Sequence, residues 1–485
     1  MHDFARPRSQ TALVEIASAH SPLQRHWVSM IAHQTLVLGA ALMAACSESS
    51  SDVGKSAAGE DASGTGDVSG STDDGTDGQD GTDGENDAAD GQDATDSVDG
   101  TDEGDGATDG TEAADGTDGA VSTDVSDRVD FDPVTTDSKG LTPELGFTVP
   151  EDAISFHITA VTAGESGITI GLLRDPEGTF LVPKAWYDSP LNQGPSLCTG
   201  CRIRVAGAES AQGVLVPNTT EQSVKPGKYK LSFFTYTTAQ ASPFEAPVIT
   251  PVQKEVKAHV LIRRSASGAP TESILALNLH FTGAGDLTAA NAPEDPRIEQ
   301  ALQTFKDIYA QRGIAVGEVR YKDIDAGLKK IESISGPGND LATVARLTEG
   351  NEEGVNVIFV DSITDSSSPF AGFGVILGIA GGIPGPAGVQ GTAKSAVFVS
   401  LQDVSGQGGP SAEVGFGQVM AHECGHYLGL YHSSELSFGP QGIHDPIPDT
   451  AENDMDNLMY YSGAGTTLSD GQGFVLRNNP WVVPK

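Results

Sequence analysis

The chain has 485 residues, enough for two or three domains. Its formal net charge is −39. With 27 acidic and 3 basic residues, the segment between residues 51 and 140 contributes −24 of that, which leaves −15 for the rest of the chain. An acidic chain without a stripe of Lys and Arg repels phosphate, so nucleic acid is excluded as an expected partner.

The N-terminal segment predicts export. Residues 35–46 read TLVLGAALMAAC, an apolar run too short to cross a bilayer and typical of the core of a signal peptide. Its last five residues, LMAAC, resemble a bacterial lipobox. This resemblance implies a signal peptide over residues 1–46, a lipid on Cys46, and attachment to the outer membrane or cell surface through that lipid alone. The alternative is an ordinary signal peptide with a nearby cysteine and a protein released outside the cell.

Residues 47–140 predict a disordered acidic linker. They are rich in Asp, Gly and Thr and carry no aromatic residue before Phe131. Such a segment cannot bury enough apolar surface to offset its chain entropy, and repulsion between like charges keeps it extended. Weak calcium binding by the repeated Asp-Gly pairs is the alternative, but ordered calcium-binding repeats need a periodic apolar residue. We therefore expect a tether.

Residues 141–268 predict an all-β sandwich domain. Short runs of alternating or β-branched residues are separated by Pro, Gly and Asn, without a helical period. The clearest runs are residues 153–161, 167–173, 227–238 and 256–265. The sequence PGKYKL at 226–231 resembles the final strands of jelly-roll modules that accompany secreted bacterial peptidases.

The cysteines include one natural pair, Cys198 and Cys201 in the sequence CTGC. Outside the cytoplasm we expect a short-loop disulfide between them. Half of a zinc ribbon and a redox pair are the alternatives, although no βαβ pattern surrounds the motif. Cys424 is left unpaired, and we expect it to be buried.

Residues 269–485 predict an α+β domain with a mixed sheet and helices behind it. Strands are expected at 274–283, 314–324, 355–363 and 395–401. A helix is expected within residues 294–313, with Asp295 as its cap and Gly313 at its end. Ser469 and Gln472 form a capping pair for a last helix. The Gly- and Pro-rich residues 372–400 predict either the upper rim of a cleft or a mobile surface loop.

The sequence HECGHYLGLYH, residues 422–432, predicts a catalytic zinc site. On a helix over residues 412–428, His422 and His426 project from one face one turn apart, which suits two zinc ligands. Gly429 is expected to end the helix so that the chain returns His432 as a third ligand. The fourth zinc position is then open for water, from which Glu423 can take a proton as general base.

A second motif is the sequence DNLMYYSGAG at 456–465, which places Met459 27 residues after His432. Together the two motifs resemble the metzincin family of zinc endopeptidases. The resemblance implies a zincin fold, Met459 as an apolar floor in a tight turn beneath the zinc, and Tyr461 as a residue that helps to hold the tetrahedral intermediate. A packed or surface tyrosine is the alternative role for Tyr461.

The segment between the motifs, HDPIPDTAENDMDNLMYYSG at 444–463, looks like that of the pappalysins. Some relatives bind calcium there, so the resemblance implies a possible Ca²⁺ site formed by Asp449, Thr450 and Glu452. Exposed loop acids are the alternative. His444 is expected to be a loop residue, with a role near the substrate as the alternative.

These patterns predict an exported zinc endopeptidase, bound to the cell surface by lipid and acting on protein or peptide substrates. One alternative is a catalytically silent zincin scaffold that serves as a binding or adhesion lipoprotein. Intact Glu423 argues against it, since a decayed enzyme has no need of the base. Another alternative is that the sandwich is the functional binding part. Latency is also open, with Cys198 or Cys201 as a speculative metal-blocking residue.

Overall fold

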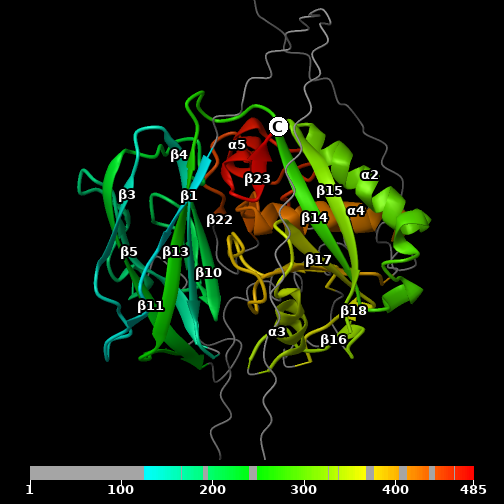
Figure 1. Cartoon of the computed structure of the whole chain (residues 1–485), viewed down its shortest axis with the longest axis horizontal. Helices are drawn as coiled ribbons and strands as arrows, with labels where there is room; N and C mark the ends of the chain where they lie inside the picture. Colours follow the sequence, from blue (N-terminus) through cyan, green and yellow to red (C-terminus); the bar gives the residue numbers. More distant parts are fainter. Residues whose placement is uncertain are drawn as a thin grey trace, which may run out of the picture. The chain divides into compact units, whose positions relative to one another are not determined.

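The computed structural model describes most of the chain from residue 125 onward. The described ranges are 125–164, 166–188, 195–239, 248–325, 327–336, 338–366, 376–402, 412–435, 443–461, 463 and 465–485. The predicted signal peptide, Cys46 and residues 47–124 lie outside them. The described part is rich in strands and has few helices (Figure 1). None of the helices in these ranges has both the length and the apolar character needed to cross a membrane.

Two antiparallel sheets form the first part of the described chain. One has the order β1-β13-β4-β10, with β2 paired to β13, and the other has the order β12-β11-β5-β6, with β3 and β9 at its sides. Their bounds are β1 Val125–Asp130, β2 Val134–Thr135, β3 Leu145–Val149, β4 Ala153–Thr162, β5 Gly167–Arg174, β6 Phe180–Val182, β9 Ala208–Glu209, β10 Ala211–Val216, β11 Gly227–Ala239, β12 Val248–Pro251 and β13 Glu255–Arg264. The four runs predicted as strands are therefore β4, β5, β11 and β13.

The two sheets pack face to face around one apolar core. Its centre is aromatic: Phe147 of β3 stacks on Tyr229 of β11, and Phe156 of β4 meets both rings edge-on at 5.2 and 5.0 Å between centroids. The side chains alternate between core and outer face along the strands, as in a β-sandwich.

The sandwich begins earlier than the sequence predicts. Strand β1 pairs with β13 over six residues, and β2 also pairs with β13. The predicted end of the linker at residue 140 is therefore wrong, because β1 and β2 already belong to the sandwich. From Ser126 to Asp130 of β1 the side chains alternate between exposed and partly buried, and Val129 packs against the sandwich core, so this short stretch has the period of a strand.

A mixed sheet forms the second part, with the order β15-β14-β17-β20-β19 and β23 paired to β14. Strands β14 (Ser273–Phe281), β15 (Ile314–Asp323), β17 (Val355–Val360) and β20 (Val397–Ser400) run parallel. Strands β19 (Gly378–Ala380) and β23 (Val482–Pro484) are antiparallel to their neighbours. This arrangement confirms the predicted mixed sheet.

Helices α2 (Pro296–Ala310) and α4 (Ala412–Tyr427) pack on the mixed sheet and share its core. Helix α2 lies beside β15 (Figure 1), and α4 contacts α2, β19 and β20. The remaining short elements are η1 Trp186–Asp188, β7 Leu197–Cys198, β8 Val205–Ala206, η2 Ala284–Asp286, η3 Ala292–Glu294, β16 Lys330–Ile331, α3 Asp340–Ala345, η4 Arg346–Thr348, β18 Ser362–Ile363, β21 Ser434–Glu435, β22 Ile443–His444 and α5 Asp470–Asn478.

The helix ends follow the predicted local signals. The carboxylate of Asp295 accepts a hydrogen bond from the backbone N–H of Arg297 at the start of α2, and Gly313 takes φ +69° just after its end. At α5, Ser469 and Gln472 form a complete capping box.

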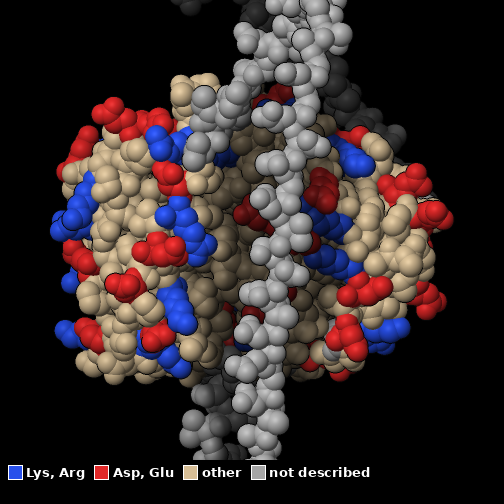
Figure 2. All heavy atoms as spheres, in the orientation of Figure 1, with Lys and Arg blue, Asp and Glu red and all other residues tan. Residues whose placement is uncertain are grey.

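Direct contacts join the sandwich and the mixed-sheet part within one compact unit that includes residues 122–485. The hydroxyl of Ser155 donates to the carbonyl of Asn478 at 2.7 Å, and the hydroxyl of Thr159 donates to the carbonyl of Ala387 at 2.9 Å. Leu215 of β10 belongs to the core of the mixed-sheet part. On the face shown in Figure 2, acidic and basic side chains are interspersed over both parts.

Candidate metal centre

Helix α4 carries the first two histidines and ends in a turn that brings the third to them. At its end, the N–H of Leu430 donates to the carbonyl of Gly425 and the N–H of Gly429 to the carbonyl of His426, both at 2.9 Å. This is the pair of bonds of a Schellman motif. Gly429 has φ +116°, a left-handed conformation that disfavours a side chain. The chain reverses there and returns His432 to the helix face.

The three imidazoles meet at their Nε2 atoms. Nε2 of His432 lies 3.2 Å from Nε2 of His422 and 3.1 Å from Nε2 of His426. The other ring nitrogens of the first two are oriented by backbone carbonyls: Nδ1 of His422 donates to Leu458 at 2.6 Å, and Nδ1 of His426 donates to Leu430 at 2.7 Å. With the proton on Nδ1, the lone pair of each Nε2 points to the common centre.

The donor set fits a zinc ion. Three nitrogens at 2.0–2.1 Å from one tetrahedral zinc lie about 3.3 Å apart, close to the spacing observed. Burial lowers the pKa of His422 to about 3 and holds the pKa of His426 well below its usual value. Both rings are therefore neutral, as metal ligands must be. Among the described residues, these three histidines form the one cluster that could hold a metal ion.

Glu423 lies beside the histidines with one oxygen held and one available. The backbone N–H of Ala380, in β19, donates to its carboxylate. Its Oε2 is buried and has no hydrogen-bond partner within the described part of the chain. Burial raises the pKa of Glu423 to about 8, and a cation in the histidine site would lower it again. This carboxylate is thus placed to accept a proton at Oε2.

Met459 lies against α4. It is fully buried, and a Cβ placed on Gly425 would lie 2.8 Å from its Sδ. Its N–H donates to the side-chain oxygen of Asn457 at 2.9 Å, and its carbonyl accepts from the N–H of Ser433 at 2.8 Å. The turn is therefore fixed to the segment that carries His432.

Tyr461, two residues further, is partly buried, and its ring centroid lies 4.3 Å from that of Tyr460. This contact does not place its hydroxyl at the histidines, so its predicted role in holding the intermediate stays a prediction.

The residues suggested for calcium have other partners. The carboxylate of Asp449 accepts from the hydroxyl of Ser469 and from the N–H of Gly471, both at 2.8 Å, at the start of α5. The hydroxyl of Thr450 donates to Asp445 at 2.7 Å, and Glu452 is exposed. Asp449 therefore fastens the loop to α5, and Thr450 holds Asp445.

His444 lies in β22, directly before this loop. Its two ring nitrogens contact the hydroxyl of Ser434 at 3.3 Å and the carbonyl of Thr450 at 3.0 Å. The predicted loop position is therefore wrong, since His444 is a partly buried strand residue, and neither partner belongs to the histidine centre.

The cysteines are used structurally. Cys198 and Cys201 form a disulfide with each other, so neither offers a thiolate to block the metal site. Cys424 is fully buried in α4, and burial raises the pKa of its thiol.

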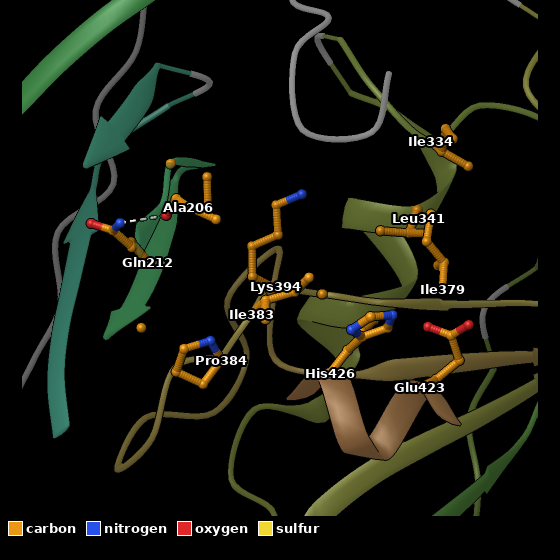
Figure 3. Close-up of a pocket in the computed structure, with 16 residues that line it drawn as sticks. Ala206, Gln212, Ile334, Leu341, Ile379, Ile383, Pro384, Lys394, Glu423 and His426 are labelled. Atoms are coloured by element: carbon orange, nitrogen blue, oxygen red, sulfur yellow. Dashed lines mark hydrogen bonds between the residues drawn. The ribbon is translucent and has the colours of Figure 1, made fainter. Parts of the chain in front are cut away.

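The sequence did not identify the hollow above Glu423 and His426 (Figure 3). It has a volume of about 660 Å³, part of it open to solvent. Ile334, Leu341 and Ile379 line one side, and Lys394 also lines it. The Gly- and Pro-rich composition around β19 was the available signal, because such a backbone can approach other groups closely. The residues that face one another across the hollow are brought together by long-range strand pairing, which a local sequence pattern does not contain.

No family model and no curated protein matches the chain. Among solved structures it is similar to metalloproteinase-II from Bacteroides fragilis, with 16% identity, 46% of this chain and 63% of that chain covered, and a TM-score of 0.25. A family two carbohydrate esterase from Clostridium thermocellum in complex with cellohexaose shows 12% identity, coverage of 47% and 61%, and a TM-score of 0.12. The chain spans less than two thirds of either protein. These scores are too low to support an argument about fold or function.

Proposed function

We propose that this protein is a zinc-dependent endopeptidase of the metzincin type, similar to the pappalysins, that cleaves protein or peptide substrates. One observation carries the proposal. Three buried Nε2 atoms converge with a zinc ligand spacing, and the unpartnered Oε2 of Glu423 lies on the same helix, one residue from His422. A structural metal site has no use for a buried carboxylate oxygen without a partner, whereas a catalytic site needs one.

A zinc ion bound by the three imidazoles would polarise the scissile carbonyl and lower the pKa of a water molecule beside it. Glu423 takes the proton of the attacking water on Oε2 and gives it to the leaving amine. Its other oxygen is held by the N–H of Ala380, which fixes the orientation of the carboxylate.

Strand β19 also gives the substrate a place to bind. It is the last strand in the order of the mixed sheet, so one of its edges is free of a strand partner within the described chain. An extended peptide can add to such an edge as a further strand. A Cβ on Gly378 would lie 2.6 Å from Cγ of Glu423, so this glycine lets the edge strand approach the proton acceptor.

The proposal includes export and anchoring. Residues 1–46 direct secretion, Cys46 carries the lipid, and the acidic segment that follows keeps the enzyme away from the membrane. The apolar core and small residues of the leader, and the Asp-Gly composition of the segment, support this part of the proposal.

The test uses the purified chain with its metal content measured. We expect about one zinc per chain and cleavage of a denatured protein substrate that a zinc chelator stops. Glu423→Gln should keep the zinc and lower kcat/KM by at least about 100-fold, because it removes the general base. Glu452→Gln, at an exposed glutamate, is the matched control and should have no effect. Full zinc loading without cleavage of any substrate would contradict the proposal and favour a silent binding or adhesion scaffold.

A further inference from the structure

Lys394 lines the hollow above the candidate metal centre, and most of its side chain is buried. Only 8% of its surface is exposed, although lysine is rarely buried without a counter-charge. Within the described residues, its ammonium group has neither an ion pair nor a hydrogen bond. Figure 3 shows the side chain extending into the space between Ala206 on one side and Leu341 on the other.

The backbone of Lys394 is fixed relative to Glu423. Its N–H donates to the hydroxyl of Thr392 at 3.2 Å, and the next carbonyl, that of Ser395, accepts from the side-chain amide of Asn356 at 2.8 Å. A Cβ on Gly381 would lie 2.3 Å from the carbonyl oxygen of Lys394, so the two backbones are in close contact. Gly381 directly follows Ala380, whose N–H holds Glu423. Lys394 is therefore presented by a rigid turn beside the reacting groups.

The rest of the lining forms no ion pair with Lys394. Of the described residues that line the hollow, Glu423 is the single acidic one, one of its oxygens accepts from Ala380, and it forms no ion pair with Lys394. Ile334, Leu341 and Ile379 form an apolar wall. An anionic group that entered beside this wall would leave water and meet an ammonium group in surroundings where a charged hydrogen bond is strong.

We infer that Lys394 binds a carboxylate of the peptide substrate close to the cleaved bond, so that the enzyme selects acidic substrates. The inference rests on the proposed peptidase function and adds a substrate class to it. Two sources supply the same chemistry: the side chain of a Glu or Asp residue within the peptide, and the carboxylate at its C-terminus.

The first experiment digests a library of peptides with the full chain and sequences the products. The preferred cleavage site is then made as four peptides, with Glu or Gln at the selected position and with a free or amidated C-terminus. For an internal acidic residue, kcat/KM should be about tenfold to one hundredfold higher for Glu than for Gln, whatever the C-terminus. A preference that follows the free C-terminus and disappears on amidation assigns the carboxylate to the peptide end.

Substitutions of Lys394 decide whether this residue causes the preference. Lys394→Met should bring the Glu to Gln ratio close to one, Lys394→Arg should keep it, and Lys394→Glu should shift the preference to a Lys peptide. Lys330→Met, at an exposed lysine, is the control and should keep the wild-type ratio. A packing role alone would alter both peptides equally, so it predicts an unchanged ratio in every variant.

A binding measurement separates this inference from the proposed function. In Glu423→Gln, calorimetry should show tighter binding of the acidic peptide, and the added Lys394→Met should remove the difference. Cleavage without any acidic preference overturns the inference and leaves the peptidase proposal intact. If no peptide is cleaved, the peptidase proposal fails, and equal binding of the Glu and Gln peptides overturns the inference as well. If Lys394→Met does not fold, the Arg and Glu variants give the decision.

Discussion

The contact between Gly425 and Met459 can be tested by adding one methyl group to helix α4. In Gly425→Ala, the new Cβ would lie 2.8 Å from Sδ of Met459 and 3.6 Å from its Cε. Non-bonded atoms of this size normally stay about 3.5–4.0 Å apart, so the sulfur must move by roughly 1 Å. Met459 is fully buried and its backbone is bonded on both sides, which leaves little room for that movement.

The expected stability change is the difference of two opposing effects. Overpacking a core contact costs about 1–3 kcal/mol. Replacing glycine by alanine within a helix contributes about 1 kcal/mol in the other direction. The free energy of unfolding of the metal-free protein should therefore fall by up to about 2 kcal/mol in urea titrations.

Metal affinity is the sharper measurement. Leu458, next to Met459, supplies the carbonyl that orients His422. A shift of this turn should lower zinc affinity by about 10- to 100-fold, as loss of such a supporting contact does. Competition with a coloured chelator measures it. Gly200→Ala is the control, because its Cβ would meet no atom within 4 Å.

A double variant identifies the cause. Met459→Ala alone should cost about 2–5 kcal/mol by leaving a cavity. Gly425→Ala with Met459→Ala should cost less than the sum, since the methyl group then has space. Energies that add within about 0.5 kcal/mol would refute the contact. So would a Gly425→Ala protein that is more stable and keeps its zinc affinity.

Two further predictions concern the turn after α4 and the contact with the sandwich. Gly429→Ala should lower the free energy of unfolding by about 1–2 kcal/mol, because φ +116° strains a residue with a Cβ; an unchanged urea midpoint would contradict this. Burial lowers the pKa of His157 to about 3, so the folded protein keeps this ring neutral while the unfolded chain takes up a proton below pH 6.5. The contribution of the neutral His157 ring to the free energy of unfolding is complete above pH 6.5. It is lost as the pH falls toward 3, at about 1.4 kcal/mol per pH unit. Unfolding measured across this range should have a shallower pH slope in His157→Gln, and equal slopes would show that His157 titrates normally.

Features set by neighbouring residues were predictable from the sequence. The capping pair Ser469–Gln472 and the cap Asp295 act within one helical turn, and both are present as expected. The histidines could be placed because their spacing matches the helical period and Gly429 marks the helix end. In each case the physical cause lies within a few residues of its effect.

Features set by distant contacts could not be predicted. Asp449 looked like a calcium ligand, but its carboxylate holds the start of α5, 20 residues later in the chain. Strand β1 was assigned to the linker because its partner, β13, lies over a hundred residues away. Lys394 carries no local sign of function; its position depends on the pairing of β19 with β20 and on the packing of both beside α4.

The sandwich and the mixed-sheet part are physically coupled at the turn that forms the metal centre. A Cβ on Gly429 would lie 3.2 Å from Cδ2 of Leu215 in β10, so the sandwich contacts the residue that returns His432 to the site. Two positions before Leu215, on the same face of β10, a Cβ on Gly213 would lie 2.5 Å from the carbonyl oxygen of Gly385. With Leu215 buried in the core of the mixed-sheet part, separating the two parts would expose that core and remove support from the turn. The sandwich is therefore part of the structure that holds the histidines, and a binding function for it would add to this role without replacing it.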